Sequence, residues 1–172
     1  MDIWVTCYFI DERERDMTIA HEFPVVKAEM LIRRPAYEVF EAFVNPEATT
    51  KFWFTKSSGR LEKASHVKWD WEMYGVSDIV KVKELRKNEY LLLEWSSDHT
   101  ITEVTFTTRD EDGTFVTISH SGFAGAGDEI VLQAIDSMGG YTMVLCGLKA
   151  YLEHGILLNL VADKAPDAHV QG

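Results

Sequence analysis

One long helix near the carboxyl end of the chain most limits the folds that this sequence can adopt. Between residues 128 and 154, apolar side chains recur at spacings of 4, 3, 4, 3 and 4 residues. They are Ala134, Met138, Tyr141, Leu145, Leu148 and Leu152. This spacing is typical of the apolar stripe of an amphipathic helix, and Gly155 is a residue at which helices end. At about 1.5 Å per residue the helix would be roughly 40 Å long, so we expect it to cross an entire curved sheet.

The segments that precede this helix have the pattern of short β-strands. Six runs combine alternating apolar and polar positions with β-branched and aromatic residues, which favour strands. Their expected bounds are 24–35, 66–74, 77–86, 90–96, 100–109 and 114–121. The connections after residue 66 are short and contain turn residues, so consecutive strands must pair antiparallel.

Two short helices are expected between the first strand and the second. Residues 36–54 carry apolar side chains at helical spacing, and Asn45-Pro46 interrupts this spacing. Proline is favoured at the first position of a helix, so Pro46 can begin a second one. The complete order predicts an α+β fold in which the inner face of an antiparallel sheet packs against the long helix.

The stretch HVKWDWEMYG, residues 66–75, places Trp69 and Trp71 on one side of its strand. Val67 and Met73 continue the same side, whereas the residues between them are charged. Such a stripe either fills a core or forms the wall of a cavity. By the same alternation, the inner face of the sheet is expected to carry Val67, Trp69, Trp71, Met73, Leu91, Leu93, Trp95, Val104, Phe106, Val116, Ile118 and His120.

The chain of 172 residues is long enough for one domain with a substantial core. We predict an extension at 1–23, one domain at 24–155 and a tail at 156–172. Met17 is an alternative start within this extension. The extension is either a leader strand or a translated addition, or it forms an extra strand or a dimer contact through Trp4, Tyr8 and Phe9. The apolar segment 156–162 either extends the helix into the core or meets a second subunit, so a monomer and a homodimer are both compatible with the sequence.

Charge and cysteine usage exclude several functional classes. Lys plus Arg number 17 against 28 for Asp plus Glu, a net charge of −11, which argues against binding to nucleic acid or anionic membranes. Cys7 and Cys146 belong to no CxxC pair, so neither a disulfide framework nor a thiolate zinc site is expected. The first residues lack the basic region of a signal peptide, and no run of about 20 apolar residues predicts a membrane span. We therefore predict a cytoplasmic protein.

An ordered set of segments resembles a known family. These segments are YEVFEAFVNPEATTKFWF, VKWDWEM, LLLEW, VTFTTRDEDGTFVTISHSGF and GGYTMVLCGLKAYLEHG. Over about residues 24–155 they are similar to bacterial proteins grouped with the activator of Hsp90 ATPase homologue, in the START-like (SRPBCC) superfamily. The resemblance implies a helix-grip fold (START/Bet v1-like), in which a curved sheet of about seven strands wraps the long helix around a hydrophobic cavity. Eukaryotic activators have an additional amino-terminal domain, and residues 1–23 are too few to replace it.

This resemblance favours the cavity interpretation of the aromatic stripe, since such pockets are mostly apolar with a few polar groups. The predicted ligand-binding residues are Trp53, Trp69, Trp71, Met73, Trp95, Phe106, His120, Phe123, Met138 and Tyr141. His120 is either a hydrogen-bonded core histidine or a group that orients a ligand or transfers a proton, with Tyr141 and Glu72 as possible assistants. Phe123, in the glycine-rich stretch GFAGAGDE, would plug a flexible mouth.

Other motifs do not indicate catalysis. GFAGAGDE lacks the lysine of a phosphate loop, and Asp128 and Glu129 would repel an anion there. The remaining histidines are scattered, Ser121 lacks a nucleophile motif, and the family shares no catalytic set. Gly139-Gly140 inside the helix indicates either close packing or a kink that gives a cavity room. We expect no catalytic residue, no metal site and no cofactor.

The sequence thus predicts binding of a hydrophobic, lipid- or polyketide-like small molecule, by a carrier or sensor rather than an enzyme. One alternative is an enzyme resembling polyketide cyclases and dehydratases, or hydrolases. Another is a protein-interaction or co-chaperone module related to the activators of the Hsp90 ATPase.

Overall fold

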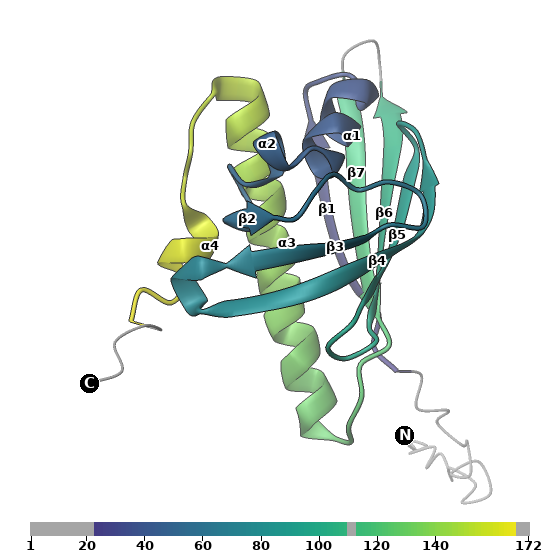
Figure 1. The fold of residues 1–172 in the computed structure, drawn as a ribbon, viewed down its shortest axis with the longest axis vertical. Helices are drawn as coiled ribbons and strands as arrows, with labels where there is room; N and C mark the ends of the chain where they lie inside the picture. The colour runs from purple at the N-terminus through teal and green to yellow at the C-terminus, as the bar shows by residue number, and fades with distance from the viewer. Residues whose placement is uncertain (1–22, 110–112, 168–172) are drawn as a thin grey trace, which may run out of the picture.

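The computed structural model describes residues 23–109 and 113–167 of the chain (Figure 1). The predictions for the extension, namely the alternative start at Met17 and a contact made by Trp4, Tyr8 and Phe9, lie outside the described residues.

Seven antiparallel strands form one sheet with the order β1-β7-β6-β5-β4-β3-β2. The strands are β1 (Val26–Ile32), β2 (Lys56–Ser57), β3 (His66–Trp71), β4 (Val76–Arg86), β5 (Tyr90–Trp95), β6 (Ile101–Arg109) and β7 (Gly113–Ser121). The predicted α+β helix-grip class is confirmed, and so are the strands of the meander. The two-residue strand β2 had not been assigned from the sequence, because it is too short to show an alternating pattern.

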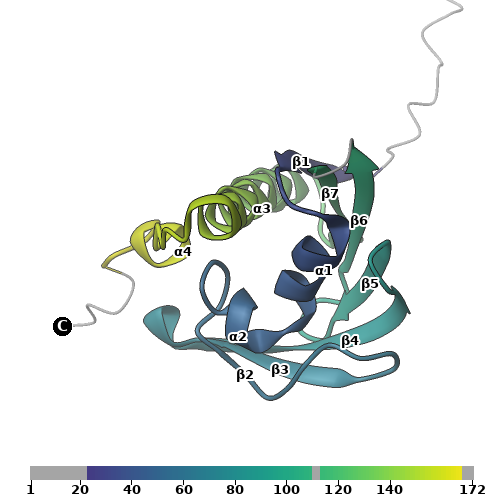
Figure 2. The same cartoon turned by 90° about the horizontal axis from the view of Figure 1, so that it is seen from above.

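The helices are α1 (Ala36–Val44), α2 (Pro46–Thr49), α3 (Asp128–His154) and α4 (Leu160–Asp163). Figure 2 shows the sheet curving around α1 and α2, while α3 lies along its open side next to β1. The side-chain oxygen of Asn45 accepts a hydrogen bond from the N–H of Glu47, with Pro46 at the first position of α2. Gly155 ends α3 in the left-handed conformation, and its N–H donates to the carbonyl of Tyr151.

The predicted alternation holds along most of the inner face. Its buried side chains include Val67, Trp69, Leu91, Leu93, Val104, Phe106, Val116 and Ile118. From the other side, α3 contributes Val144, Leu145 and Leu148, which are almost wholly buried. Helix α1 fills the concave side as well, with Phe40 and Phe43 in the same core. The core therefore has three contributors, the sheet, α1 and α3.

The structure corrects one part of the inner-face prediction. Strand β3 ends at Trp71 and not at residue 74, because residues Glu72–Tyr74 form a 3-10 turn that Gly75 closes with a φ of 62°. The backbone needs a left-handed residue there, which glycine supplies without a steric penalty. Met73 therefore does not continue the stripe of Trp69 and Trp71.

The tail does not extend α3 into the core, because the chain reverses at Gly155 (Figure 1). Ile156, Leu157 and Leu158 are about half exposed, and Val161 of α4 packs against the core. The hydroxyl of Tyr74 donates a hydrogen bond to the carbonyl of Val161, which fixes the tail beside the turn after β3. A contact of this segment with a second subunit stays a prediction.

Helix α3 is long and apolar enough to satisfy a membrane-span criterion based on length and composition alone. It packs along β1 and contributes to the core. The same helix continues through Gly139 and Gly140, and a Cβ at either position would meet nothing within 4 Å. Close packing at these glycines is therefore excluded.

Candidate functional site

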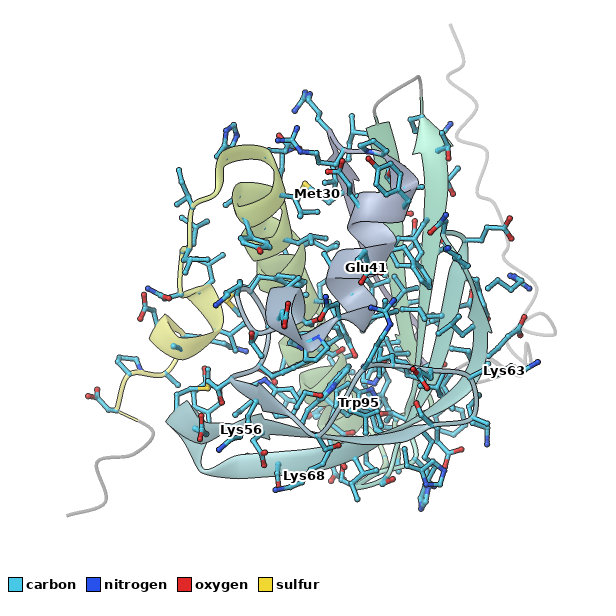
Figure 3. The ribbon with its side chains drawn as sticks, turned by 45° about the horizontal axis from the view of Figure 1, so that its top comes forward. Met30, Glu41, Lys56, Lys63, Lys68 and Trp95 are labelled. Carbon is cyan, nitrogen blue, oxygen red and sulfur yellow. The ribbon has the colours of Figure 1, made fainter. Side chains whose placement is uncertain are left out.

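A cavity of about 400 Å³ lies between α3, the sheet and the tail. The sheet and its connections contribute Trp53, Trp71, Tyr74, Asp78, Trp95, Asp98, Thr100, His120 and Phe123 to its lining. The helix and the tail contribute Gln133, Asp136, Ser137, Gly140, Tyr141, Met143, Val144, Val161 and Lys164. Trp95 lies at the end of β5, between the sheet and the helices (Figure 3). No residue of α1 lines the cavity.

Tryptophan rings form the apolar wall of this cavity. The rings of Trp71 and Trp95 lie 6.0 Å apart, with an angle of 36° between their planes. Behind them, Trp69 meets Trp71 edge-on at 6.3 Å and Trp95 edge-on at 5.6 Å. Trp53 faces Tyr141 of α3 at 5.9 Å, also edge-on. Edge-on and tilted arrangements are favourable for aromatic pairs, so the wall is held by ring–ring contacts.

A chain of hydrogen bonds connects this wall to α3. The indole N–H of Trp95 donates to the hydroxyl oxygen of Thr102 at 2.8 Å, and this oxygen lies 2.6 Å from the hydroxyl of Tyr141. Burial raises the pKa of Tyr141 far above its ordinary value. The Tyr141 hydroxyl therefore stays protonated at neutral pH, and it acts as a structural link and not as an acid.

His120 joins the end of β7 to the middle of α3. Its Nδ1 lies 2.6 Å from the hydroxyl of Ser137, and its ring meets Phe123 and Tyr141 edge-on. Burial lowers the pKa of His120 to about 4, although the charge of Asp98 opposes this shift. The imidazole is therefore neutral at pH 7. Its buried Nε2 has no hydrogen-bond partner among the residues that the structure describes.

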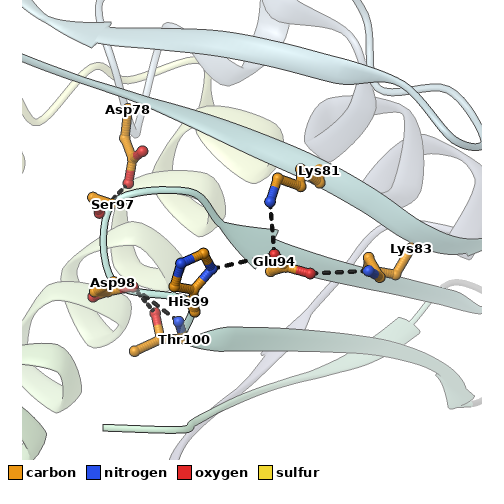
Figure 4. A network of polar contacts seen from close by, with 8 residues as sticks. All are labelled: Asp78, Lys81, Lys83, Glu94, Ser97, Asp98, His99 and Thr100. Atoms are coloured by element: carbon orange, nitrogen blue, oxygen red, sulfur yellow. Dashed lines mark hydrogen bonds and ion pairs between the residues drawn. The ribbon is translucent and has the colours of Figure 1, made fainter. Parts of the chain in front are cut away.

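Three carboxylates, those of Asp78, Asp98 and Asp136, line the cavity, and the last two are exposed, so they mark its mouth. Figure 4 shows Asp78 and Asp98 beside the connection between β5 and β6. Asp78 accepts a hydrogen bond from the hydroxyl of Ser97 at 2.6 Å. Asp98 accepts two bonds from Thr100, one from the backbone N–H at 2.9 Å and one from the hydroxyl at 2.7 Å. On α3, Asp136 forms an ion pair with Lys164 of the tail. These bonds fix the positions of the acidic groups.

The family model described as "Activator of Hsp90 ATPase homolog 1-like protein" matches residues 33–153, which is more than half of the chain. The chain belongs to this family. The resemblance seen in the sequence is thereby confirmed. The comparison with curated proteins found no match.

Several solved structures have the same fold as this member of the family. Protein SSP2350 from Staphylococcus saprophyticus has a TM-score of 0.69 and 29% identity, covering 78% of this chain and 96% of its own. The Aha1 dimer from Colwellia psychrerythraea has a TM-score of 0.67 and 20% identity, covering 77% and 98%. PFC0360w, an HSP90 activator from Plasmodium falciparum, has a TM-score of 0.61 and 14% identity, covering 75% and 96%.

In this family member, the structure brings six of the ten predicted ligand-binding residues to the cavity. They are Trp53, Trp71, Trp95, His120, Phe123 and Tyr141. These six residues belong to four separate parts of the chain, which the fold brings together: the segment after α2, the inner strands, the loop before α3 and α3 itself.

The other four predicted residues do not line it. Trp69 is 1% exposed and stacks on Phe54 at 4.4 Å, which puts it one layer behind the wall. Phe106 packs against Phe40 at 5.4 Å, in the part of the core that α1 fills. Met73, in the 3-10 turn, borders a smaller hollow beside the tail.

Met138 lies on the outer side of α3 and is 41% exposed. Glu72, expected as an assistant of His120, pairs with Lys56 at the surface and does not line the cavity. Sequence alternation gives the face on which a side chain lies, but not whether a second layer covers it.

The polar groups of the mouth were not predicted from the sequence. Asp78, Asp98 and Asp136 had not been singled out, because they are ordinary polar residues near the start of a strand, in a turn and on a helix surface. A weak signal was present in Asp98 followed two residues later by Thr100, since aspartate in turns often accepts hydrogen bonds from the residue two positions on. In the described parts of the chain, no group of three or more His, Cys, Asp or Glu side chains could hold a metal ion.

Proposed function

We propose that this protein is a cytoplasmic carrier or sensor that binds an apolar small molecule in the tryptophan-walled cavity. The observation that supports it most is the cavity of about 400 Å³ bordered by Trp53, Trp71 and Trp95. This volume falls within the range of roughly 300–1,000 Å³ that is usual for small-molecule sites.

Binding would come mainly from removing apolar surface of the ligand from water, at about 25 cal/mol per Å². The wall itself needs no rearrangement, because its rings are already packed on one another. The indole N–H of Trp95 and the hydroxyl of Tyr141 are already hydrogen-bonded to Thr102. Both residues would therefore offer apolar surface to a ligand. His120 and the polar groups at the mouth would then orient the ligand through polar contacts.

Titration with a neutral fluorescent probe, N-phenyl-1-naphthylamine, tests this proposal. The wild-type protein should bind it saturably, and Trp71→Ala should lower the affinity about tenfold, since lost ring contact of this size is worth about 1.4 kcal/mol. Phe115→Ala is the matched control, because Phe115 is a half-buried aromatic residue that does not line the cavity. Absence of saturable binding, or equal effects of the two variants, would contradict the proposal.

One observation favours the hydrolase alternative. The hydroxyl of Ser137 and Nδ1 of His120 are within hydrogen-bond distance at 2.6 Å, and both residues line the cavity. Such a pair can generate a nucleophile. Against this, a pKa near 4 makes His120 a weak base, and Ser137 lies within the continuous helix α3, where backbone N–H groups are occupied. Labelling of Ser137 by a fluorophosphonate would support this alternative.

Another observation favours the interaction-module alternative. On the first half of α3, Val131, Leu132 and Ile135 are more than half exposed, and an apolar surface of this kind can serve as a contact for another protein. One solved structure of the same fold is described as an HSP90 activator. Stimulation of the ATPase of a bacterial Hsp90, abolished by Ile135→Glu, would support a co-chaperone role here.

A further inference from the structure

The mouth of the cavity carries an excess of negative charge. Asp78, Asp98 and Asp136 line it, and Lys164 is the one lysine or arginine among the described lining residues. Because Lys164 is ion-paired with Asp136, its charge is already balanced. Neither of the two other carboxylates forms an ion pair within the part of the chain that the structure describes.

Both of these carboxylates are held in place by the connection between β5 and β6 (Figure 4). Ser97 donates to Asp78, and Thr100 donates twice to Asp98. These hydrogen bonds hold both side chains in place beside the cavity.

The interior does not offset this charge. His120 is 9% exposed and borders the cavity, and burial keeps its ring neutral at pH 7. Its Nε2 has no partner among the described residues, so a polar group of the ring remains unused beside the cavity. A ligand with a polar group would find there an uncharged imidazole and not a cation.

The walls favour a positive charge in the ligand as well. Trp71 and Trp95 lie 6.0 Å apart, and Trp53 also lines the cavity. Indole is the aromatic ring that attracts an ammonium group most strongly when the group lies within about 6 Å of the ring centre. An aromatic wall behind an acidic mouth is therefore suited to an organic cation, whereas a carboxylate or phosphate would be repelled.

We propose that the ligand of this cavity is an apolar or aromatic molecule that carries a protonated amine. This inference rests on the proposed function, since it specifies the chemical class of the small molecule. The amine would lie at the edge of the tryptophan wall, on the side of Asp78 and Asp98, while the apolar part would lie against the ring faces of Trp71 and Trp95.

Three naphthalene derivatives of nearly equal size test the inference by isothermal titration calorimetry at pH 7 and low salt. They are 1-naphthylmethylamine, 1-naphthalenemethanol and 1-naphthoate, which are cationic, neutral and anionic. The amine should bind about threefold to tenfold more tightly than the alcohol, and the carboxylate more weakly by a similar factor, because the acids are partly screened by solvent. The preference should shrink when salt is raised to about 0.5 M.

Charge-removing variants show where the preference originates. In Asp78→Asn and Asp98→Asn the side-chain oxygen can still accept the bonds from Ser97 and Thr100, and each variant should lower the amine-to-carboxylate ratio about threefold. Glu62→Gln changes the net charge by the same amount on an exposed residue outside the cavity lining. That control should leave the ratio unchanged. Using two aspartate variants keeps the test valid if one of them does not fold.

The outcomes separate the inference from the proposed function. If the alcohol binds but the carboxylate binds as tightly as the amine, the charge inference is overturned while the cavity remains a binding site. An equal effect of Glu62→Gln and Asp78→Asn would also overturn it, since the preference would then come from the overall charge. If none of the three compounds binds, the proposed function itself fails.

Discussion

At the scale of single residues, His120 carries an ionisable ring into a mostly apolar environment. Its pKa is lowered to about 4 by burial, with Asp98 acting in the opposite direction, whereas a histidine of the unfolded chain has a pKa of about 6.5. Below pH 6.5 the unfolded chain therefore takes up a proton that the folded protein does not. The free energy of unfolding should fall as the pH decreases from 6.5 toward 4, by about 2 kcal/mol between pH 7 and pH 5 from this residue.

Urea unfolding of the wild type and of His120→Phe at these two pH values measures this contribution. Phenylalanine can keep the ring contacts with Phe123 and Tyr141 but cannot bind a proton. The variant should therefore lose less stability on acidification than the wild type, by about 2 kcal/mol. An equal loss in both proteins would show that His120 is not held neutral.

The residue scale is also where prediction from the sequence is least complete. Alternation along β3 correctly placed Trp69 and Trp71 on the inner face, but only Trp71 lines the cavity. The difference arises because Phe54 stacks on Trp69, a contact between residues that no periodic pattern connects. Phe106 also lies on the inner face as predicted, but α1 covers it, so it does not line the cavity.

At the scale of elements, α3 and the meander were predictable because their periodicity is long and regular. The exact end of β3 was not, since it depends on the 3-10 turn that Gly75 closes. The reversal of the tail could not be read from ILLNLVA either, because an apolar segment fits a helix extension and a subunit contact equally well. The acidic mouth could not be predicted from the sequence, because its residues lie on β4, the β5–β6 connection and α3, which come together only in the folded protein.

The two glycines of α3 give a prediction at this scale. A Cβ at Gly139 or at Gly140 would meet nothing within 4 Å, so alanine fits at both positions without displacement of a neighbour. Because glycine destabilises a helix interior by about 1 kcal/mol relative to alanine, Gly139→Ala and Gly140→Ala should each raise the free energy of unfolding by about that amount. Thermal or urea denaturation measures this change in the free energy of unfolding. A loss of stability in either variant would contradict the prediction, since it would show that an alanine side chain does not fit there.

At the scale of the whole molecule, the fold leaves space because two elements share the concave side of one sheet. Helix α1 fills the part around Phe106, and α3 spans the open side with Gly140 facing the cavity. The central claim is that the remaining space of about 400 Å³ is a binding site for a guest molecule and not an incidental gap. The adjacent glycines provide a matched pair for testing this claim, since Gly140 lines the cavity and Gly139 does not.

The most direct measurement is the affinity of N-phenyl-1-naphthylamine for Gly140→Leu and for Gly139→Leu, with folding checked by circular dichroism. A leucine at position 140 would occupy the cavity, so the affinity should fall by about tenfold or more. A leucine at position 139 would leave the cavity unchanged, and the affinity should stay within about twofold of the wild type. Wild-type affinity in folded Gly140→Leu would contradict the account, because the probe would then be bound somewhere else.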